Sequence, residues 1–206
     1  MARKTFGIAL LAMVSVLSGT ALAQKSNEIA GIFGRTFISN QSVSGTTAKI
    51  YFGDGLTYEA NFSHNFLNFG FVSIAVEVPF VFNPSTNLSF SAANAVPKDF
   101  RSYFITPAAR ATLFPSTRFN PWVRVGGGFA SYSPSSTLQY GGTNPNTKNT
   151  TTGVFEVGGG LDVAIWGPLK LRGEIRDFNA SEPPINLRLN SRYSHLYAGA
   201  GVVFSF

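Results

Sequence analysis

The chain has 206 residues, of which 44% are hydrophobic and 13% charged, and its formal net charge is +6. It contains no Cys, which excludes disulfides, thiolate metal sites and thiol catalysis. The excess of basic residues is small and scattered, so no nucleic-acid-binding surface is expected.

The first residues have the pattern of a targeting segment. Arg3 and Lys4 give a positively charged start, and the apolar run 6–17 follows. Ala21-Leu22-Ala23 then matches the small-x-small motif that a signal peptidase cleaves. A membrane anchor is the alternative, but the apolar run is too short to span about 30 Å of hydrocarbon. We therefore predict a cleavable signal peptide over 1–23, with Ala21 and Ala23 at the cleavage site.

The remaining chain, 24–206, is expected to form one domain of β-strands. The sequence holds 21 Gly and 20 Phe, a combination that opposes helices. No stretch has about 18 consecutive apolar residues, which excludes transmembrane helices. Eight runs of alternating polarity predict strands instead. These runs are Glu28–Ile38, Leu56–His64, Phe69–Phe82, Phe100–Phe114, Trp122–Ser131, Thr152–Ile165, Leu169–Phe178 and Arg192–Phe206.

The connections between the runs alternate between long and short. The long polar connections are Ser39–Gly55, Asn83–Asp99, Tyr132–Thr151 and Asn179–Ser191. The short ones are Asn65–Asn68, Pro115–Pro121 and Trp166–Pro168. This asymmetry is typical of an up-and-down membrane barrel with both termini on the side of the short turns.

Each run divides its side chains between an apolar and a polar face. In Phe69–Phe82, Val76 and Val78 share one face, while Ser73 and Glu77 share the other. Alternation alone also fits a soluble lipocalin-like carrier with its apolar face inside. The predicted signal peptide, the abundance of Phe and the unequal connections favour the inverse, an eight-stranded antiparallel transmembrane β-barrel with apolar residues against lipid.

In this barrel the polar faces would meet inside as a network of charges. Buried charges are tolerated when they are paired, so we predict salt bridges rather than an open ion path. The predicted network consists of Arg35, Glu59, Glu77, Arg110, Arg124, Glu156, Asp162, Lys170, Arg172, Glu174 and Arg176. Other inward residues are expected to be bulky (Phe71, Phe104, Trp122, Tyr197) or small (Gly126, Gly128, Gly158, Gly160, Gly199, Gly201).

Two charges and two prolines test the assignment of faces. Arg101 and Asp177 would point outward, but at the loop-side rim, where a charge on the lipid face is least unfavourable. Pro79 and Pro107 lack the N–H that a paired strand uses, and we predict a β-bulge at each.

The end of the chain carries a family resemblance. Phe206 and Phe204 follow Leu196, Ala198, Ala200 and Val202 on one face of the last run. This pattern resembles the C-terminal signature of bacterial outer-membrane barrels, and the region after residue 23 resembles the OmpA/OmpX class of small barrels in architecture. No motif points to a subfamily. The resemblance implies location in the bacterial outer membrane, contact with its lipids and recognition of Phe204 and Phe206 by the barrel-assembly machinery.

No peptidoglycan-binding domain follows the predicted barrel, so a role in wall anchoring is not expected. We expect a monomer.

No catalytic, cofactor or metal site is predicted. His64 and His195 each adjoin a Ser, but adjacent residues of a strand point to opposite faces. The His-x-Ser-Asn arrangement of deacylase barrels is not matched by His195-Leu196-Tyr197. Both histidines are therefore interpreted as hydrogen-bonding residues of the interior or rim.

The predicted role is structural or interactive: the barrel would support the envelope, or its long loops would contact surface ligands. The alternative is a narrow channel for small solutes. A lipid-modifying enzyme is the third hypothesis and a soluble carrier the fourth.

Overall fold

The computed structural model describes residues 26–181, 185–187 and 193–206. The predicted signal peptide, with Ala21 and Ala23, lies outside these residues. Within the described ranges all regular structure is β-strand, and no helix there is long and apolar enough to cross a membrane.

The strands form a closed ring of antiparallel neighbours. β1 (Asn27–Ile38) pairs with β4 (Gly55–Asn68) on one side and with β11 (Tyr193–Ser205) on the other, which closes the barrel. Around the rest of the wall lie β5 (Val72–Phe90), β6 (Asp99–Ile105) with β7 (Ala108–Leu113), β8 (Phe119–Pro134), β9 (Thr150–Trp166) and β10 (Leu169–Ala180). Because β6 and β7 are two segments of one wall strand between β5 and β8, the ring has eight strands, as predicted.

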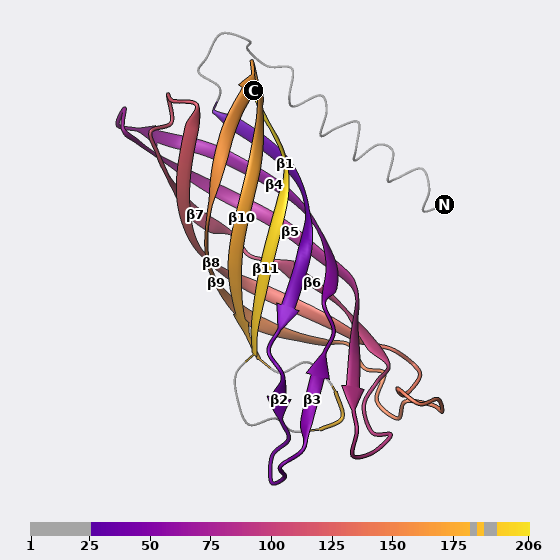
Figure 1. Cartoon of the computed structure of the whole chain (residues 1–206). Coiled ribbons are helices and arrows are strands. Elements are labelled where there is room, and N and C mark those ends of the chain that lie inside the picture. The colour runs from indigo at the N-terminus through magenta and orange to yellow at the C-terminus, as the bar shows by residue number, and fades with distance from the viewer. Residues whose placement is uncertain (1–25, 182–184, 188–192) are drawn as a thin grey trace, which may run out of the picture.

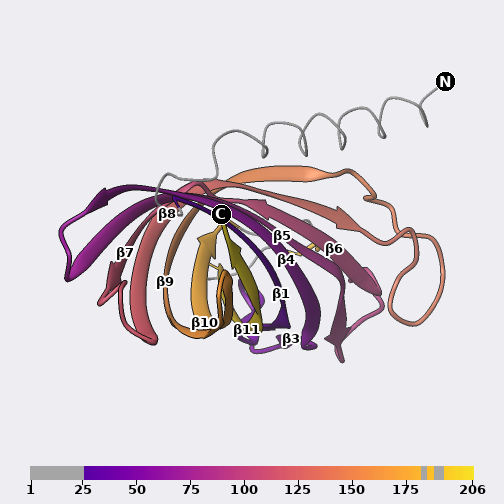
Figure 2. The same cartoon turned by 90° about the horizontal axis from the view of Figure 1, so that it is seen from above.

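The two ends of the barrel differ. Figure 1 shows the tilted strands, with the C-terminus and the tight turns at one end and β2 and β3 at the other. Figure 2 shows the same strands curving around the interior. We call these ends the turn side and the loop side.

The first long connection and the end of β5 build a small extension on the loop side. β2 (Gln41–Ser42) pairs with β3 (Lys49–Phe52), and β3 pairs with β5 through Ile50 and Phe90. The prediction of a connection over Asn83–Asp99 was therefore wrong for its first half. The strand continues because Leu88 and Phe90 still alternate with polar residues and are buried.

The prediction of a bulge at Pro79 and at Pro107 was wrong, because no register shift falls at either proline. The register of β5 is the same on both sides of Pro79, and β6 and β7 keep one register across Pro107. The pairing of β5 with β6 and β7 is interrupted at both prolines. The hydrogen bonds that a proline cannot donate are therefore not required there. The ladder between β5 and β6 shifts its register further along, between Asn83 and Thr86 beside Pro84.

The outer wall is apolar and carries aromatic side chains near both ends, as membrane barrels do. Near the turn side these are Phe66, Phe69, Phe71, Phe114, Phe119 and Trp166, all exposed. Towards the loop side the rings of Phe33 and Tyr58 lie 5.5 Å apart, and those of Phe82 and Tyr103 lie 4.9 Å apart.

Phe71 was expected inside, and that expectation was wrong, because its side chain is 67% exposed. It belongs to the turn before β5, where Gly70 has a φ of +84° and the alternation of a strand does not apply.

The faces are those of a membrane barrel. Mid-strand residues such as Val123, Val125 and Ile175 are exposed, whereas Glu77 and Arg176 are completely buried. A soluble barrel would have the opposite arrangement, because water solvates charged groups at the surface and favours the burial of apolar groups.

Candidate functional site

The middle of the interior is held by one arginine between two carboxylates. Arg124 of β8 places Nη1 2.9 Å from Oε2 of Glu77 and Nε 2.6 Å from Oε1 of Glu156. Thr106 donates its hydroxyl proton to the other oxygen of Glu156 at 2.6 Å. All these charged side chains are buried, so each needs its partner.

The network continues towards the turn side through Glu28. Its carboxylate accepts from Arg110 at 2.5 Å and from Lys170 at 2.6 Å. Arg110 also lies 2.8 Å from Glu77, which connects this group to Arg124. Four strands, β1, β5, β7 and β10, are thus tied together across the interior.

Arg172 forms the most regular ion pair. Its Nε and Nη2 both donate to Asp162 at 2.7 Å, in the two-pronged geometry that arginine and carboxylate favour. Trp122 donates its indole N–H to the same carboxylate at 3.0 Å, and the guanidinium lies 5.0 Å from the ring centre. This cation–π contact fills the space between β8 and β10.

Further towards the loop side, two carboxylates share one guanidinium. Arg176 pairs with Glu59 and lies 2.7 Å from Glu174. Tyr197 packs beside it, with the guanidinium carbon 5.7 Å from the ring centre. The inward Gly199 leaves the room that the Tyr197 ring occupies.

The structure places every residue of the predicted network inside the barrel except Arg35. The Arg35 side chain is 62% exposed on the outer wall, 3.7 Å from Asp54. It shares the outward parity of Phe33 and Phe37, and the same parity rule brings Glu28 inside. Glu28 was missed, although its spacing from Ala30 and Ile32 was the signal for it.

With this correction, acids outnumber bases among the interior residues that the structure describes. The six carboxylates are those of Glu28, Glu59, Glu77, Glu156, Asp162 and Glu174, and the five cations are Arg110, Arg124, Lys170, Arg172 and Arg176.

Above the charges, towards the loop side, the interior becomes aromatic. Phe104 packs against Phe178 and His195 at ring distances of 4.9 and 5.3 Å. Nε2 of His195 and the hydroxyl of Tyr132 are hydrogen-bonded at 3.2 Å. All four side chains are buried, so they fill this section of the barrel as an aromatic plug.

The loops cover the plug. Gln139 accepts from the Phe90 N–H at 2.7 Å and donates to the carbonyl of Ala93 at 3.1 Å. Asn186 donates to Asn144 at 2.9 Å, which joins a third connection to this cover. Beneath it lie the buried apolar residues Ile50, Leu88, Phe90, Val96 and Ile185.

At the turn side, the interior is open as far as the charged residues of the network. A polar cavity of about 340 Å³ on the turn side is lined by Glu28, Arg110, Asp162 and Lys170, together with turn residues. We call it the turn-side vestibule.

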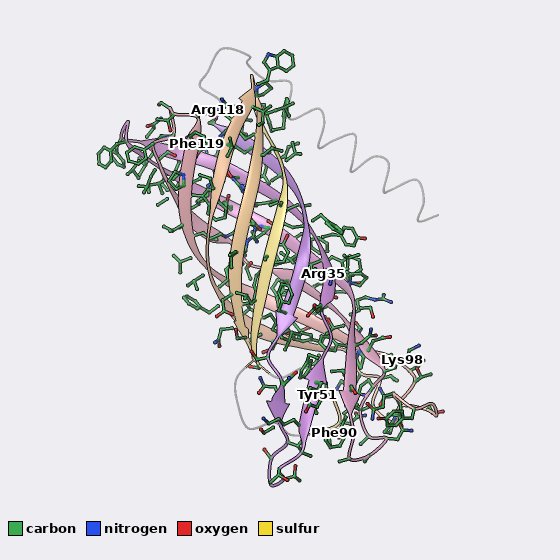
Figure 3. The ribbon with its side chains drawn as sticks, in the orientation of Figure 1. Arg35, Tyr51, Phe90, Lys98, Arg118 and Phe119 are labelled. Atoms are coloured by element: carbon green, nitrogen blue, oxygen red, sulfur yellow. The ribbon has the colours of Figure 1, made fainter. Side chains whose placement is uncertain are left out.

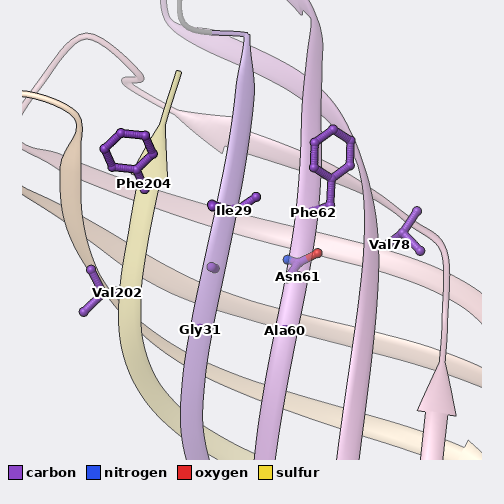
Figure 4. A pocket seen from close by; sticks show the side chains of 9 residues that line it. Ile29, Gly31, Ala60, Asn61, Phe62, Val78, Val202 and Phe204 are labelled. Carbon is purple, nitrogen blue, oxygen red and sulfur yellow. The ribbon is translucent and has the colours of Figure 1, made fainter. Parts of the chain in front are cut away.

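The outer wall has a shallow apolar groove of about 540 Å³ beside the seam of β1 and β11, shown in Figure 4. The small residues Gly31 and Ala60 form its floor, and its sides are formed by Ile29, Phe62, Val78, Val202 and Phe204. Since it faces outward on the apolar wall, it belongs to the lipid-facing surface.

The two histidines lie apart from each other. His64 is exposed near the turn side, where its Nδ1 is hydrogen-bonded to Oδ1 of Asn27 at 2.8 Å, whereas His195 is buried in the aromatic plug. In the part of the chain that the structure describes, no group of three His, Asp or Glu residues is placed to hold a metal.

Comparisons with known proteins identify the fold. No protein-family model matches the chain, and no curated protein matches its sequence. Among solved structures, Neisserial surface protein A is similar with a TM-score of 0.56 at 15% identity, over 89% of this chain and 98% of that chain. The outer membrane protein AlkL is similar with a TM-score of 0.54 at 11% identity, over 92% and 94% of the two chains. OprG from Pseudomonas aeruginosa is similar with a TM-score of 0.52 at 10% identity, over 88% and 96%.

The chain therefore has the fold of the small eight-stranded outer-membrane barrels, the OmpA/OmpX class that its sequence resembles. Fold and lipid-facing wall together are those of a protein of the bacterial outer membrane.

Proposed function

We propose that the protein is a closed barrel that supports the outer membrane and presents an ordered loop surface to ligands outside the cell. The observation that supports this proposal is that two separate groups of side chains fill the interior. Paired charges around Arg124 occupy the middle, and the aromatic plug around Phe104 occupies the loop side. Either filling alone would obstruct the passage of solutes through so narrow a barrel.

The loop surface supports a role in contact. Side-chain hydrogen bonds join the loops, among them Asn94 to the Gly141 carbonyl at 2.8 Å and Gln139 to Phe90. Ordered loops lose less conformational entropy when a ligand binds. Exposed Tyr51 and Tyr140 are available for such contacts, and Figure 3 shows Tyr51 at the loop end.

A narrow channel is the second candidate, and the turn-side vestibule is the observation that favours it. Water that enters there reaches Lys170 and Glu28, so rearrangement of the remaining ion pairs would extend the path.

We propose no catalytic role. The hydroxyl of Ser194, the chain neighbour of His195, donates to Asp177 at 2.5 Å, and Nε2 of His195 is hydrogen-bonded to Tyr132. Burial of His195 beneath the loops also separates it from lipid substrates.

Conductance in planar lipid bilayers distinguishes the first two candidates. We expect the wild-type protein, shown to be folded by its heat-dependent gel mobility, to give no current above the leak. A steady conductance that falls in Lys170→Gln and is unchanged in the loop variant Lys148→Gln would establish the channel and overturn the closed barrel.

We further propose recognition of the last strand by the barrel-assembly machinery, with a monomer as the product. Phe204 and Phe206 stack at 6.1 Å, and Phe206 exchanges backbone hydrogen bonds with Asn27 at the closing seam. Phe206→Ala is expected to lower the amount of assembled barrel in the outer membrane. Phe155→Ala, which removes another exposed ring from the wall, should leave assembly intact.

A further inference from the structure

Two acids inside the barrel meet at one arginine. The same nitrogen of Arg176, Nη2, pairs with Oε1 of Glu59 and lies 2.7 Å from Oε1 of Glu174. Among the residues that the structure describes, Arg176 is the only basic side chain that forms a salt bridge with either carboxylate. If both acids were ionised, one negative charge would therefore remain uncompensated.

The surroundings of the two acids do not solvate such a charge. The side chains of Glu59, Glu174 and Arg176 are completely buried. Neither carboxylate lines the turn-side vestibule, where water could reach it. A buried carboxyl group without a partner takes up a proton rather than remain ionised, and two carboxylates that share a site favour one proton between them.

The nearby charges are already used by partners of their own. Arg124 lies between Glu77 and Glu156, and Arg172 is held by Asp162 at 2.7 Å. The charged and titratable groups around the pair are Glu77 of β5, Arg110 of β7, Arg124 of β8, Glu156 and Asp162 of β9, Arg172 and Arg176 of β10, and Tyr197 of β11. The strands β1 and β6 add uncharged side chains there, such as Ile32 and Phe104.

The oxygens of the pair are placed to share a proton. Oε2 of Glu59 and both carboxyl oxygens of Glu174 are buried without a hydrogen-bond partner in the described residues. The two side chains are within hydrogen-bonding reach of each other. Ionised carboxylates only accept hydrogen bonds, so this contact becomes a hydrogen bond only when one of the two groups carries a proton.

Tyr197 is an independent sign of an unfilled polar site. Its hydroxyl is fully buried and has no hydrogen-bond partner among the described residues. It lies over Gly199, because a Cβ added at Gly199 would meet this hydroxyl. Gly199 is the ladder partner of Glu174, so the hydroxyl is directed to the place where the two acids meet.

We propose that Glu59 and Glu174 share one proton at neutral pH, so that a carboxyl–carboxylate hydrogen bond joins β4 to β10 inside the barrel. These strands are not neighbours in the wall, since β1 and β11 lie between them. A proton is favoured over a metal cation because the guanidinium of Arg176 would repel a metal ion at the same place. The proposal is independent of whether the barrel conducts or its loops bind ligands.

The test is infrared spectroscopy of the full barrel refolded in lipid vesicles. We expect the wild-type protein at neutral pH to show the carbonyl band of one protonated carboxyl group, which disappears at alkaline pH. Labelling the side-chain carboxyl carbon of glutamate with carbon-13 should shift this band. Its absence at neutral pH, or its failure to shift, would overturn the proposal, and the wild-type protein alone suffices for both measurements.

Two variants assign the band to the pair. Glu59→Gln and Glu174→Gln each leave one acid for one guanidinium, so the remaining acid ionises and the band should be lost in both. Glu156→Gln, which removes a buried acid with its own partner Arg124, should retain it. Gel mobility without boiling confirms that each variant is folded. A band that persists in both pair variants, or that is lost only in Glu156→Gln, would place the proton elsewhere. Absence of the band together with a requirement for sodium or potassium ions for stability would assign a metal cation instead.

Discussion

Arg124 and Arg35 carry the same side chain in opposite surroundings. Arg124 is buried between Glu77 and Glu156, whereas Arg35 is exposed beside Asp54. Loss of one partner from a buried ion pair leaves an uncompensated charge, which typically destabilises a protein by about 3–5 kcal/mol.

We therefore expect Arg124→Met to lower the free energy of unfolding by about 3–5 kcal/mol, because Glu156 loses its guanidinium partner and Glu77 loses one of its ion pairs inside the barrel. Arg35→Met should change it by less than about 1 kcal/mol. Urea unfolding in lipid vesicles, followed by gel mobility without boiling, measures both. Equal effects of the two variants would contradict the buried network.

The pair of carboxylates at Arg176 gives a second prediction. Because Glu59 and Glu174 share one guanidinium, Glu174→Gln removes an excess negative charge and should change the free energy of unfolding by less than about 1 kcal/mol. Arg176→Met leaves both acids unpaired and should cost about 3–5 kcal/mol. The same unfolding measurement applies, and a larger loss in Glu174→Gln than in Arg176→Met would exclude this arrangement of charges.

At the scale of the strands, inward glycines allow the barrel to close around large side chains. A Cβ at Gly160 of β9 would meet the Gly173 carbonyl and lie 2.5 Å from a ring atom of Trp122, which is closer than real contacts allow. Gly153 of the same strand has nothing within 4 Å of that position.

Gly160→Ala is therefore expected to destabilise the barrel by about 1–3 kcal/mol through overpacking. Gly153→Ala should be neutral or slightly stabilising, since the added methyl meets no neighbour and restricts the unfolded chain. The transition temperature of the unboiled gel band compares the two. If both alanines were tolerated equally, Trp122 would not occupy the place assigned to it.

The strands also show how much of the fold the sequence pattern predicts. Alternation predicted eight runs within a few residues of the strands, because burial of one face forces period 2. It did not predict the extension of β5 to Phe90, because that segment is buried by β3 and the loops rather than by the barrel. Nor did it show that Pro79 and Pro107 lie in one interrupted stretch of ladder.

At the scale of the whole molecule, the central feature is the inversion of its faces. The absence of Cys permits a direct test with single introduced cysteines. A fluorophore on Val125→Cys, whose native side chain is 49% exposed in mid-strand, is expected to be quenched by doxyl-labelled lipid and not by aqueous iodide. On Thr137→Cys in a loop the opposite is expected. Quenching of the Val125 position by iodide alone would mean that the wall faces water.

The sequence alone predicts the eight strands of the wall, the unequal connections and which residues share a face, because each follows from local periodicity and turn composition. It also contained the parity that places Glu28 inside and Arg35 outside. Tertiary structure alone decided which acid meets which base, since Arg110 and Glu28 are 82 residues apart in the chain. It also decided that the loop side is closed by an aromatic plug. The plug depends on the register and tilt of strands distant in sequence, which local patterns do not encode.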